Sequence, residues 1–173
     1  VMGSIYMREV LGIENPRVGL VNNGAEEEKG NALTKEAYQL LKKAELNFVG
    51  NVEARDLPLG ACDVIVCDGF VGNVVMKLME GCAVSFSTML KQEFMKKTSY
   101  KIGAALAKPA LRNFKKQMDY TEYGGALLLG VNSGVIKAHG SSNAKAIKNA
   151  IRQARTFTQQ GTVELIKEKL SQL

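Results

Sequence analysis

The sequence predicts an α/β protein built on a mostly parallel sheet. Short apolar runs alternate with amphipathic stretches whose apolar residues recur at helical spacing, and the connections between them are short. One of these runs, Val64–Cys67, is apolar at consecutive positions, as expected of a parallel strand that is covered on both faces. The length of 173 residues suits a single domain with its own hydrophobic core. We therefore expect one α/β domain over residues 1–173.

Four short apolar runs are the predicted strands, namely Arg17–Asn22, Asn47–Gly50, Val64–Cys67 and Gly134–Ala138. Helical periodicity predicts helices over Met2–Gly12, Leu33–Ala44, Val71–Lys96, Asn143–Gln159 and Thr162–Leu170. Pro109 is expected to divide the segment after Lys96 into two short helical pieces. Four strands are few for such a sheet, and the opening helix follows no strand. We therefore expect the chain to be the later part of a longer α/β protein, with its N-terminal half absent.

Composition excludes several classes of protein. The chain is 46% apolar and 23% charged, which argues against disorder. It has no run of about 18 uncharged apolar residues that could span a membrane. Its three cysteines form no CxxC pair, so neither a disulfide framework nor a metal site is expected, and a reducing cytoplasm is the predicted location.

Positive charge is concentrated in one segment. Residues 91–118 hold eight of the 23 lysines and arginines against Glu93 alone, although the net charge of the whole chain is only +6. The rest of the chain is close to neutral, unlike a protein with a diffuse nucleic-acid-binding surface, so no nucleic-acid partner is expected. This basic amphipathic helical excursion suits an anionic membrane surface or an acidic protein partner, and a solvated excursion or an oligomer contact is the alternative. The residues predicted to make such a contact are Lys96, Lys97, Lys101, Ile102, Leu106, Lys108, Leu111, Arg112, Phe114 and Lys115.

Three predicted strand-to-helix junctions combine glycine with small polar residues, at Asn22–Asn31, Asp68–Asn73 and His139–Asn143. Glycine permits a close backbone approach to a ligand, and the amides of a helix N-terminus favour anions. Ligands bind beyond the carboxyl ends of parallel strands, so three such junctions on one sheet edge predict an anion pocket. Its predicted phosphate- or substrate-binding residues are Gly24, Gly30, Asn31, Asp68, Gly69, Phe70, Gly72, Gly140, Ser141 and Ser142.

The alternative for each junction is that these are ordinary turn and cap residues, with Ser142 or Asn143 serving only to cap a helix. The carboxylates of Glu26–Glu28 would also repel phosphate unless they face elsewhere or pair with Lys29. No GxGxxG or P-loop motif is present, so the prediction depends on the combination of the three junctions.

His139 is the only histidine and lies where a predicted strand ends, so it could donate to an oxyanion or phosphate or act as a general acid or base. A structural hydrogen-bonded role is equally open. Lys77 could reach back to an anion from the helix after Asn73, although a solvated lysine is the more common case. Cys67 is expected to pack within its strand rather than act as a nucleophile.

Several segments, taken together, closely resemble the bacterial phosphate acyltransferase family (PlsX). They are Gly50–Asp56, Cys67–Lys77, Asp119–Gly125 and Val135–Ser142, together with Asn15–Leu20 and Glu27–Asn31. The resemblance implies an enzyme that converts acyl-ACP (the acyl carrier protein thioester) and inorganic phosphate into acyl phosphate and free carrier protein, in phospholipid synthesis. It also implies a three-layer α/β/α fold similar to isocitrate and isopropylmalate dehydrogenases, a homodimer, and peripheral association with the inner face of the membrane.

The implied chemistry needs no cofactor and no covalent nucleophile, because phosphate itself can attack a thioester that is held in line with it. We assign catalytic roles to His139, Asn73 and Lys77, with donors aimed at the phosphate and the developing oxyanion. Two alternatives remain, a dehydrogenase-like nucleotide-binding domain and a noncatalytic module that docks on a membrane or carrier protein. Whether this chain is active on its own is left open.

Overall fold

The structure, a computed structural model, describes residues 1–117 and 124–171, apart from the side chains of residues 115–117. Lys115 therefore lies outside the described side chains, and most of the Asp119–Gly125 motif lies outside the described residues. The chain divides into two compact units, one formed by Val1–Asp68 with Tyr123–Leu173 and the other by Gly69–Glu122. The helices and strands are, in order, α1 (Met2–Glu9), β1 (Arg17–Asn22), α2 (Ala32–Lys43), β2 (Asn47–Glu53), the 3-10 helix η1 (Ala54–Leu59), β3 (Val64–Val66), α3 (Gly69–Met95), α4 (Thr98–Gln117), β4 (Ala126–Leu127), β5 (Ile136–Lys137), α5 (Ala144–Gln159) and α6 (Thr162–Ser171).

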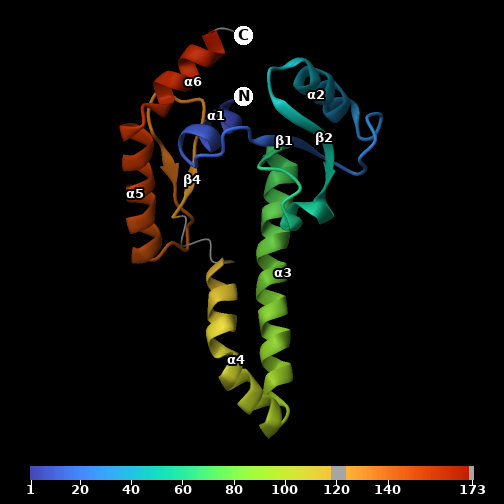
Figure 1. The fold of residues 1–173 in the computed structure, drawn as a ribbon, viewed down its shortest axis with the longest axis vertical. Coiled ribbons are helices and arrows are strands. Elements are labelled where there is room, and N and C mark those ends of the chain that lie inside the picture. Colours follow the sequence, from blue (N-terminus) through green and yellow to red (C-terminus); the bar gives the residue numbers. More distant parts are fainter. Residues whose placement is uncertain (118–123, 172–173) are drawn as a thin grey trace. The chain divides into compact units, whose positions relative to one another are not determined.

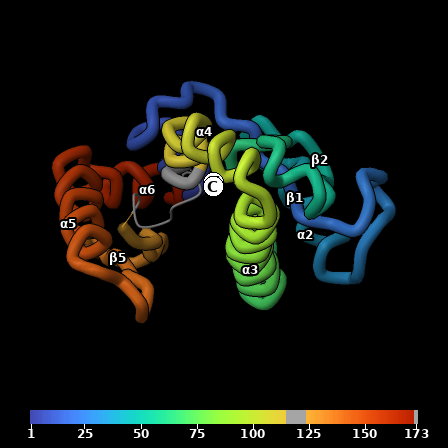
Figure 2. The backbone as a smooth tube through the Cα atoms, turned by 90° about the horizontal axis from the view of Figure 1, so that it is seen from below, coloured from blue at the N-terminus to red at the C-terminus, as the bar shows by residue number. Residues whose placement is uncertain are grey.

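The first unit contains a three-stranded parallel sheet in the order β2-β1-β3, which confirms the predicted α/β class (Figure 1). The central strand β1 is the most deeply buried, because Val18 and Leu20 are almost fully enclosed. Arg17 at its start donates to both carboxylate oxygens of Asp63, each at 3.0 Å, and so fixes β1 to the segment that leads into β3. Helix α2 packs on β1 and β2, beside which Figure 2 shows it. The rings of Tyr38 and Phe48 meet there edge to face.

The predicted fourth parallel strand, Gly134–Ala138, is wrong. Only Ile136–Lys137 is a strand there, and it pairs antiparallel with β4 in a separate two-stranded sheet. The Leu128 amide donates to the Val135 carbonyl at 2.8 Å, so the two strands form a hairpin. Gly124 and Gly125 permit this arrangement, since a Cβ at Gly124 would collide with the α5 backbone and one at Gly125 would lie 2.8 Å from the Lys137 carbonyl oxygen.

A small core joins the two ends of the chain in this first unit. Ile5 of α1, Phe157 of α5 and Ile166 of α6 form one buried cluster. Gln153 of α5 also donates to the Tyr6 hydroxyl at 3.2 Å. Helices α1, α5 and α6 therefore hold each other in place through apolar burial.

The second unit is a hairpin of two long helices, α3 and α4, which pack on each other. The expected division at Pro109 is wrong, because α4 continues from Thr98 to Gln117 with Pro109 inside it, and the helix bends along its length (Figure 1). A proline interior to a helix removes one backbone hydrogen bond and commonly bends the helix without ending it. Within the described residues, neither of these long helices, nor any other, is apolar enough over sufficient length to cross a membrane.

Several element boundaries also differ from those predicted. Helix α1 ends at Glu9 instead of Gly12, β2 extends to Glu53, and β3 stops at Val66, before Cys67. Helix α3 begins at Gly69, two residues before the predicted start at Val71. Asp68 thus directly precedes the helix, at a position where a short polar side chain favours helix initiation.

Candidate functional site

Strands β1 and β3, which precede two of the predicted junctions, both end at the carboxyl edge of the parallel sheet. Strands β1 and β3 run parallel, and their last paired residues are Leu20 and Val66. The loop from Asn22 to Asn31 and the start of the segment that leads into α3 therefore lie at one edge of the sheet. The shared edge agrees with what was expected of the ends of these two strands, whereas the strand before His139 belongs to the other sheet. The predicted anion pocket stays a prediction.

The loop after β1 is braced by two asparagine side chains. The Asn22 amide nitrogen donates to the Lys29 carbonyl at 3.0 Å and to the Asn51 side-chain oxygen at 3.1 Å. The Asn51 amide nitrogen in turn donates to the Glu26 carbonyl at 2.7 Å. Asn51 is buried in β2, and its role was not predicted from the sequence, because the predicted strand ended one residue earlier, at Gly50. These bonds fix the path of the loop.

The loop ends in a tight turn that leads into α2. Gly30 adopts a φ of +98°, and a Cβ there would overlap the Thr34 hydroxyl and lie 2.6 Å from the Asn22 side-chain oxygen. The Asn31 side chain accepts a hydrogen bond from the Thr34 amide at 3.0 Å and thus caps α2. Of the two predicted phosphate-binding residues, Asn31 therefore has a structural role, and Gly30 sets the geometry of the turn.

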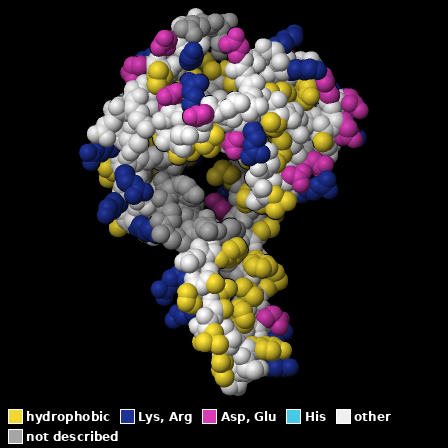
Figure 3. All heavy atoms as spheres, in the orientation of Figure 1, with side chains coloured by type: hydrophobic (Ala, Val, Ile, Leu, Met, Phe, Trp, Pro, Cys, Tyr) yellow, Lys and Arg dark blue, Asp and Glu magenta, His cyan; other side chains and the backbone are white. Residues whose placement is uncertain are grey.

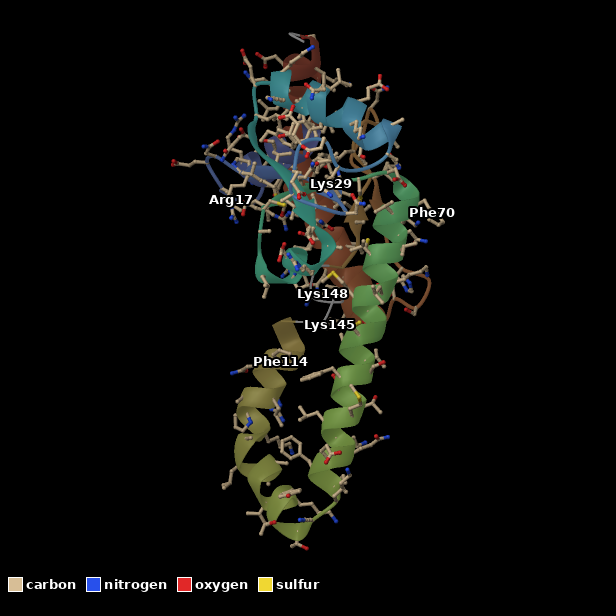
Figure 4. The ribbon with its side chains drawn as sticks, turned by 90° about the vertical axis from the view of Figure 1, so that its right-hand side faces the viewer. Arg17, Lys29, Phe70, Phe114, Lys145 and Lys148 are labelled. Atoms are coloured by element: carbon tan, nitrogen blue, oxygen red, sulfur yellow. The ribbon has the colours of Figure 1, made fainter. Side chains whose placement is uncertain are left out.

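One of the three glutamates of this loop, Glu27, is directed toward α2 and away from the predicted anion pocket. Glu27 accepts from Gln39 at 2.9 Å and from the Lys42 ammonium at 2.9 Å, so its carboxylate is turned toward α2. The hydrogen bond from Gln39, followed by that from Lys42, lowers the pKa of Glu27. The partner is Lys42 and not Lys29, whose aliphatic part lies over Gly24, close to where a Cβ would stand. Figure 4 shows Lys29 on this loop.

His139 lies in a turn whose hydrogen bonds determine which nitrogen of its ring carries the proton. The Ser141 amide donates to His139 Nδ1 at 3.1 Å, and the Ser141 hydroxyl oxygen lies 2.6 Å from the same atom. A ring nitrogen that accepts a backbone N–H carries no proton, so the neutral imidazole has its proton on Nε2. His139 is thereby set up as an Nε2–H donor, a form suited to binding an oxyanion.

The same turn leads directly into α5. The Asn143 side chain accepts from the Ala146 amide at 3.0 Å, which confirms that Asn143 caps this helix. The Ser142 amide donates to the His139 carbonyl at 3.0 Å, whereas its side-chain oxygen is buried without a hydrogen-bond partner among the described residues. A buried hydroxyl that lacks a partner is costly, and here it lies in a turn predicted to bind phosphate.

Apart from Asp68, the residues predicted in the junction after the third strand lie inside α3. Gly69, Phe70 and Gly72 belong to its first turn, and Asn73 follows inside the helix. Asn73 and Lys77 are exposed and four residues apart, so they share one face of α3. Phe70 is 79% exposed and projects from the start of the helix (Figure 4).

Cys67 follows β3 and is exposed, so the expectation that it packs within the strand is wrong. The strand stops one residue earlier, which removes Cys67 from the sheet. Partial desolvation, and secondarily the Asp68 carboxylate, raises the pKa of the Cys67 thiol. A raised pKa disfavours the thiolate, so a covalent cysteine mechanism gains no support.

The predicted site residues are thus distributed over both units. Gly24, Gly30, Asn31, Asp68, His139, Gly140, Ser141 and Ser142 belong to the first unit. Gly69, Phe70, Gly72, Asn73 and Lys77 belong to the second. The assignment of His139 and Asn73 to one cleft spans the two units and stays a prediction.

The hairpin carries the residues predicted to contact a membrane or partner. Ile102 and Leu106 of α4 are exposed, as is Phe114, which is labelled in Figure 4, whereas Leu111 is half-buried. Lys97 lies 5.3 Å from the ring centroid of Tyr100, and Lys96 pairs with Glu93. The cations Lys101, Lys108 and Arg112 are also exposed, so α4 presents charged and apolar groups together.

Comparison with known proteins gives a consistent result. A family described as fatty acid synthesis protein matches residues 1–165. A phosphate acyltransferase of Brevibacillus brevis is 61% identical over 170 residues, which is 98% of this chain and 51% of that protein. One from Alkaliphilus oremlandii is 60% identical over all of this chain and 52% of its own length, and one from Clostridium botulinum is 55% identical over 99% and 51%. The chain spans about half the length of these curated relatives.

Proposed function

Because this chain belongs to the fatty acid synthesis protein family, whose model matches residues 1–165, we propose that it forms part of a phosphate acyltransferase that makes acyl phosphate. The similarity to relatives named phosphate acyltransferase supports an acyltransferase of lipid synthesis most strongly. The acyl donor in this proposal is the thioester of an acyl carrier protein, the acceptor is inorganic phosphate, and the products are acyl phosphate and the free carrier thiol.

The reaction requires one bond to form and one to break. A phosphate oxygen attacks the thioester carbonyl carbon, and the carbonyl oxygen becomes an oxyanion. The C–S bond then breaks, and the carrier leaves as a thiolate that takes up a proton from solvent. The protein must therefore hold a dianion in line with the carbonyl carbon and stabilise the negative charge that develops on oxygen.

The turn at His139 supplies groups of the required kind. The ring presents an Nε2–H donor because its Nδ1 accepts from Ser141, and the buried Ser142 hydroxyl lacks a partner among the described residues. We assign oxyanion or phosphate binding to this turn, together with Asn73 and Lys77 of α3. At the β1 edge the Glu26 carboxylate and the aliphatic part of Lys29 occupy the space beside Gly24, so we assign no phosphate contact to that glycine.

The finer features of the proposal concern fold and location. We propose that the complete enzyme has a three-layer α/β/α fold similar to isocitrate and isopropylmalate dehydrogenases, and that it is a cytoplasmic homodimer. We further propose that α4 attaches the enzyme peripherally to the inner face of the membrane. The exposed cations and apolar side chains of α4 support this, since about 1 kcal/mol is gained for each lysine or arginine near an anionic surface.

The test is the formation of acyl phosphate from acyl carrier protein and inorganic phosphate by the full product of this gene. His139→Ala and Asn73→Ala are each expected to lower kcat by about a hundredfold, the usual loss for one oxyanion donor. His139→Gln should retain more activity than His139→Ala, because the glutamine amide can replace the Nε2–H donor. Near-normal turnover in both alanine variants would refute the site assignment, and absence of phosphate-dependent turnover in the unmodified protein would refute the function.

A further inference from the structure

Helix α5 carries a concentrated positive charge that the net charge of the chain conceals. Its sixteen residues include Lys145, Lys148, Arg152 and Arg155 but no aspartate or glutamate. All four cations are exposed. Figure 3 shows Lys and Arg side chains along the flank formed by α5, and Figure 4 labels Lys145 and Lys148 on this helix.

The four cations form a single stripe, which we call the α5 basic face. Their spacing of three, four and three residues keeps them within an arc of about 80° on a helix that turns about 100° per residue. They extend over about 15 Å of helix. The arc lies opposite the side chains that bury α5 against the unit, Ala146, Ala150 and Phe157. The stripe therefore faces away from the core.

Repulsion among the four cations weakens the helix that carries them. Like charges three or four residues apart on a helix destabilise it by about 0.2–0.5 kcal/mol per pair. Lys145 and Lys148 also lie near the N-terminal end of α5, where the helix dipole favours acidic side chains. A sequence that keeps four such cations on one face is explained by a partner that supplies the opposite charge.

We propose that the α5 basic face docks an acidic protein, and that this protein is the acyl carrier of the proposed reaction. The inference rests on the proposed function for the identity of the partner. An acidic helix of two to three turns would match the stripe in length and charge, and complementary charges both steer encounter and fix orientation. Ile147 and Ile151, which are 43% and 66% exposed beside the stripe, provide an apolar contact.

The position of α5 suits the delivery of a thioester. The helix begins at Ala144, immediately after the turn that holds His139 and Ser141. A carrier bound along α5 would therefore lie next to the turn assigned to the reacting groups. A membrane fits this face less well than it fits α4, which also exposes the bulky apolar groups Ile102, Leu106 and Phe114.

The experiment measures binding of purified acyl carrier protein to the full gene product, in parallel with binding to vesicles that contain anionic lipid. Lys148→Glu combined with Arg152→Glu is expected to weaken carrier binding at least about tenfold. The milder pair Lys148→Gln and Arg152→Gln should give an intermediate loss. Binding to the unmodified protein should weaken as salt is raised. Circular dichroism checks that each variant is folded.

A matched control applies the same charge change to α2 of the same unit, with Lys35→Glu and Lys43→Glu, two exposed residues away from α5. This pair should bind carrier normally. Equal weakening by both pairs, or none by the α5 pair, overturns the proposal, as does an α5 pair that loses vesicle binding and keeps carrier binding. If the α5 pair turns over the carrier thioester as fast as the unmodified protein does, the docking face is wrong and the proposed function stands. If the unmodified protein shows no turnover, the proposed function is wrong.

Discussion

Gly30→Ala should be far more damaging than its small change in size indicates. Gly30 has a φ of +98°, a region that costs an L-residue about 1–2 kcal/mol. The added Cβ would also overlap the Thr34 hydroxyl and press on the Asn22 side chain. Turning the Thr34 hydroxyl away breaks the hydrogen bond that it donates to the Asn31 carbonyl, at a further cost of about 1 kcal/mol. The total loss of unfolding free energy is therefore about 2–3 kcal/mol.

Gly60→Ala is the matched control, because Gly60 has a φ of +75° but a Cβ added there would meet no atom within 4 Å. It should cost only the backbone part, about 1–2 kcal/mol. Urea unfolding followed by circular dichroism measures both, and amide hydrogen exchange of the β1–α2 peptides shows whether the loss is local to the loop. Equal destabilisation by the two substitutions would refute the account of this turn.

Three further predictions follow from individual contacts. Asp63→Asn should destabilise the protein at neutral pH, because hydrogen bonds from Arg17 lower the pKa of Asp63 in the folded state. That contribution is present above the unfolded pKa of about 3.9 and is lost as the pH falls through the lower folded value, so the urea midpoints of variant and parent should converge in acid; a constant gap would contradict the pairing. Nitrogen-15 NMR of His139, the only histidine, should show the neutral ring protonated on Nε2, and an Nδ1–H form would disprove the role given to Ser141. Gly81→Ala, in open space within α3, should stabilise the hairpin by up to about 1 kcal/mol, and a lower thermal midpoint would show an unexpected packing role.

The elements predicted best from the sequence are those whose signals are local. The predicted strand Arg17–Asn22 coincides with β1, because an apolar run bounded by polar residues suits the buried centre of a sheet. The predicted helix Asn143–Gln159 differs from α5 only at its first residue. Asn143 lies just before the helix and caps it by accepting a hydrogen bond from the Ala146 amide. Short motifs were likewise sufficient to indicate the phosphate acyltransferase family, and the family match over residues 1–165 confirms this resemblance.

The errors arise where the outcome depends on distant partners. The Gly134–Ala138 run pairs antiparallel with Ala126–Leu127. This pairing was not predicted, because a partner of two residues is too short to show any periodicity. Pairing there depends on Gly124 and Gly125, whose tolerance of close contacts cannot be recognised before the neighbours are known. The positive charge of α5 was missed for a different reason. The net charge was summed over all residues outside 91–118, and in that sum the acidic residues elsewhere cancel the cations of α5.

The central claim is that phosphate itself attacks the acyl thioester. The most direct measurement supplies the full gene product with acyl carrier protein thioester and phosphate labelled on every oxygen with oxygen-18, and analyses the products by mass spectrometry. The account predicts acyl phosphate that retains all of the labelled oxygens, formed only when phosphate is present. Free fatty acid containing oxygen from unlabelled water, at a rate independent of phosphate, would contradict it.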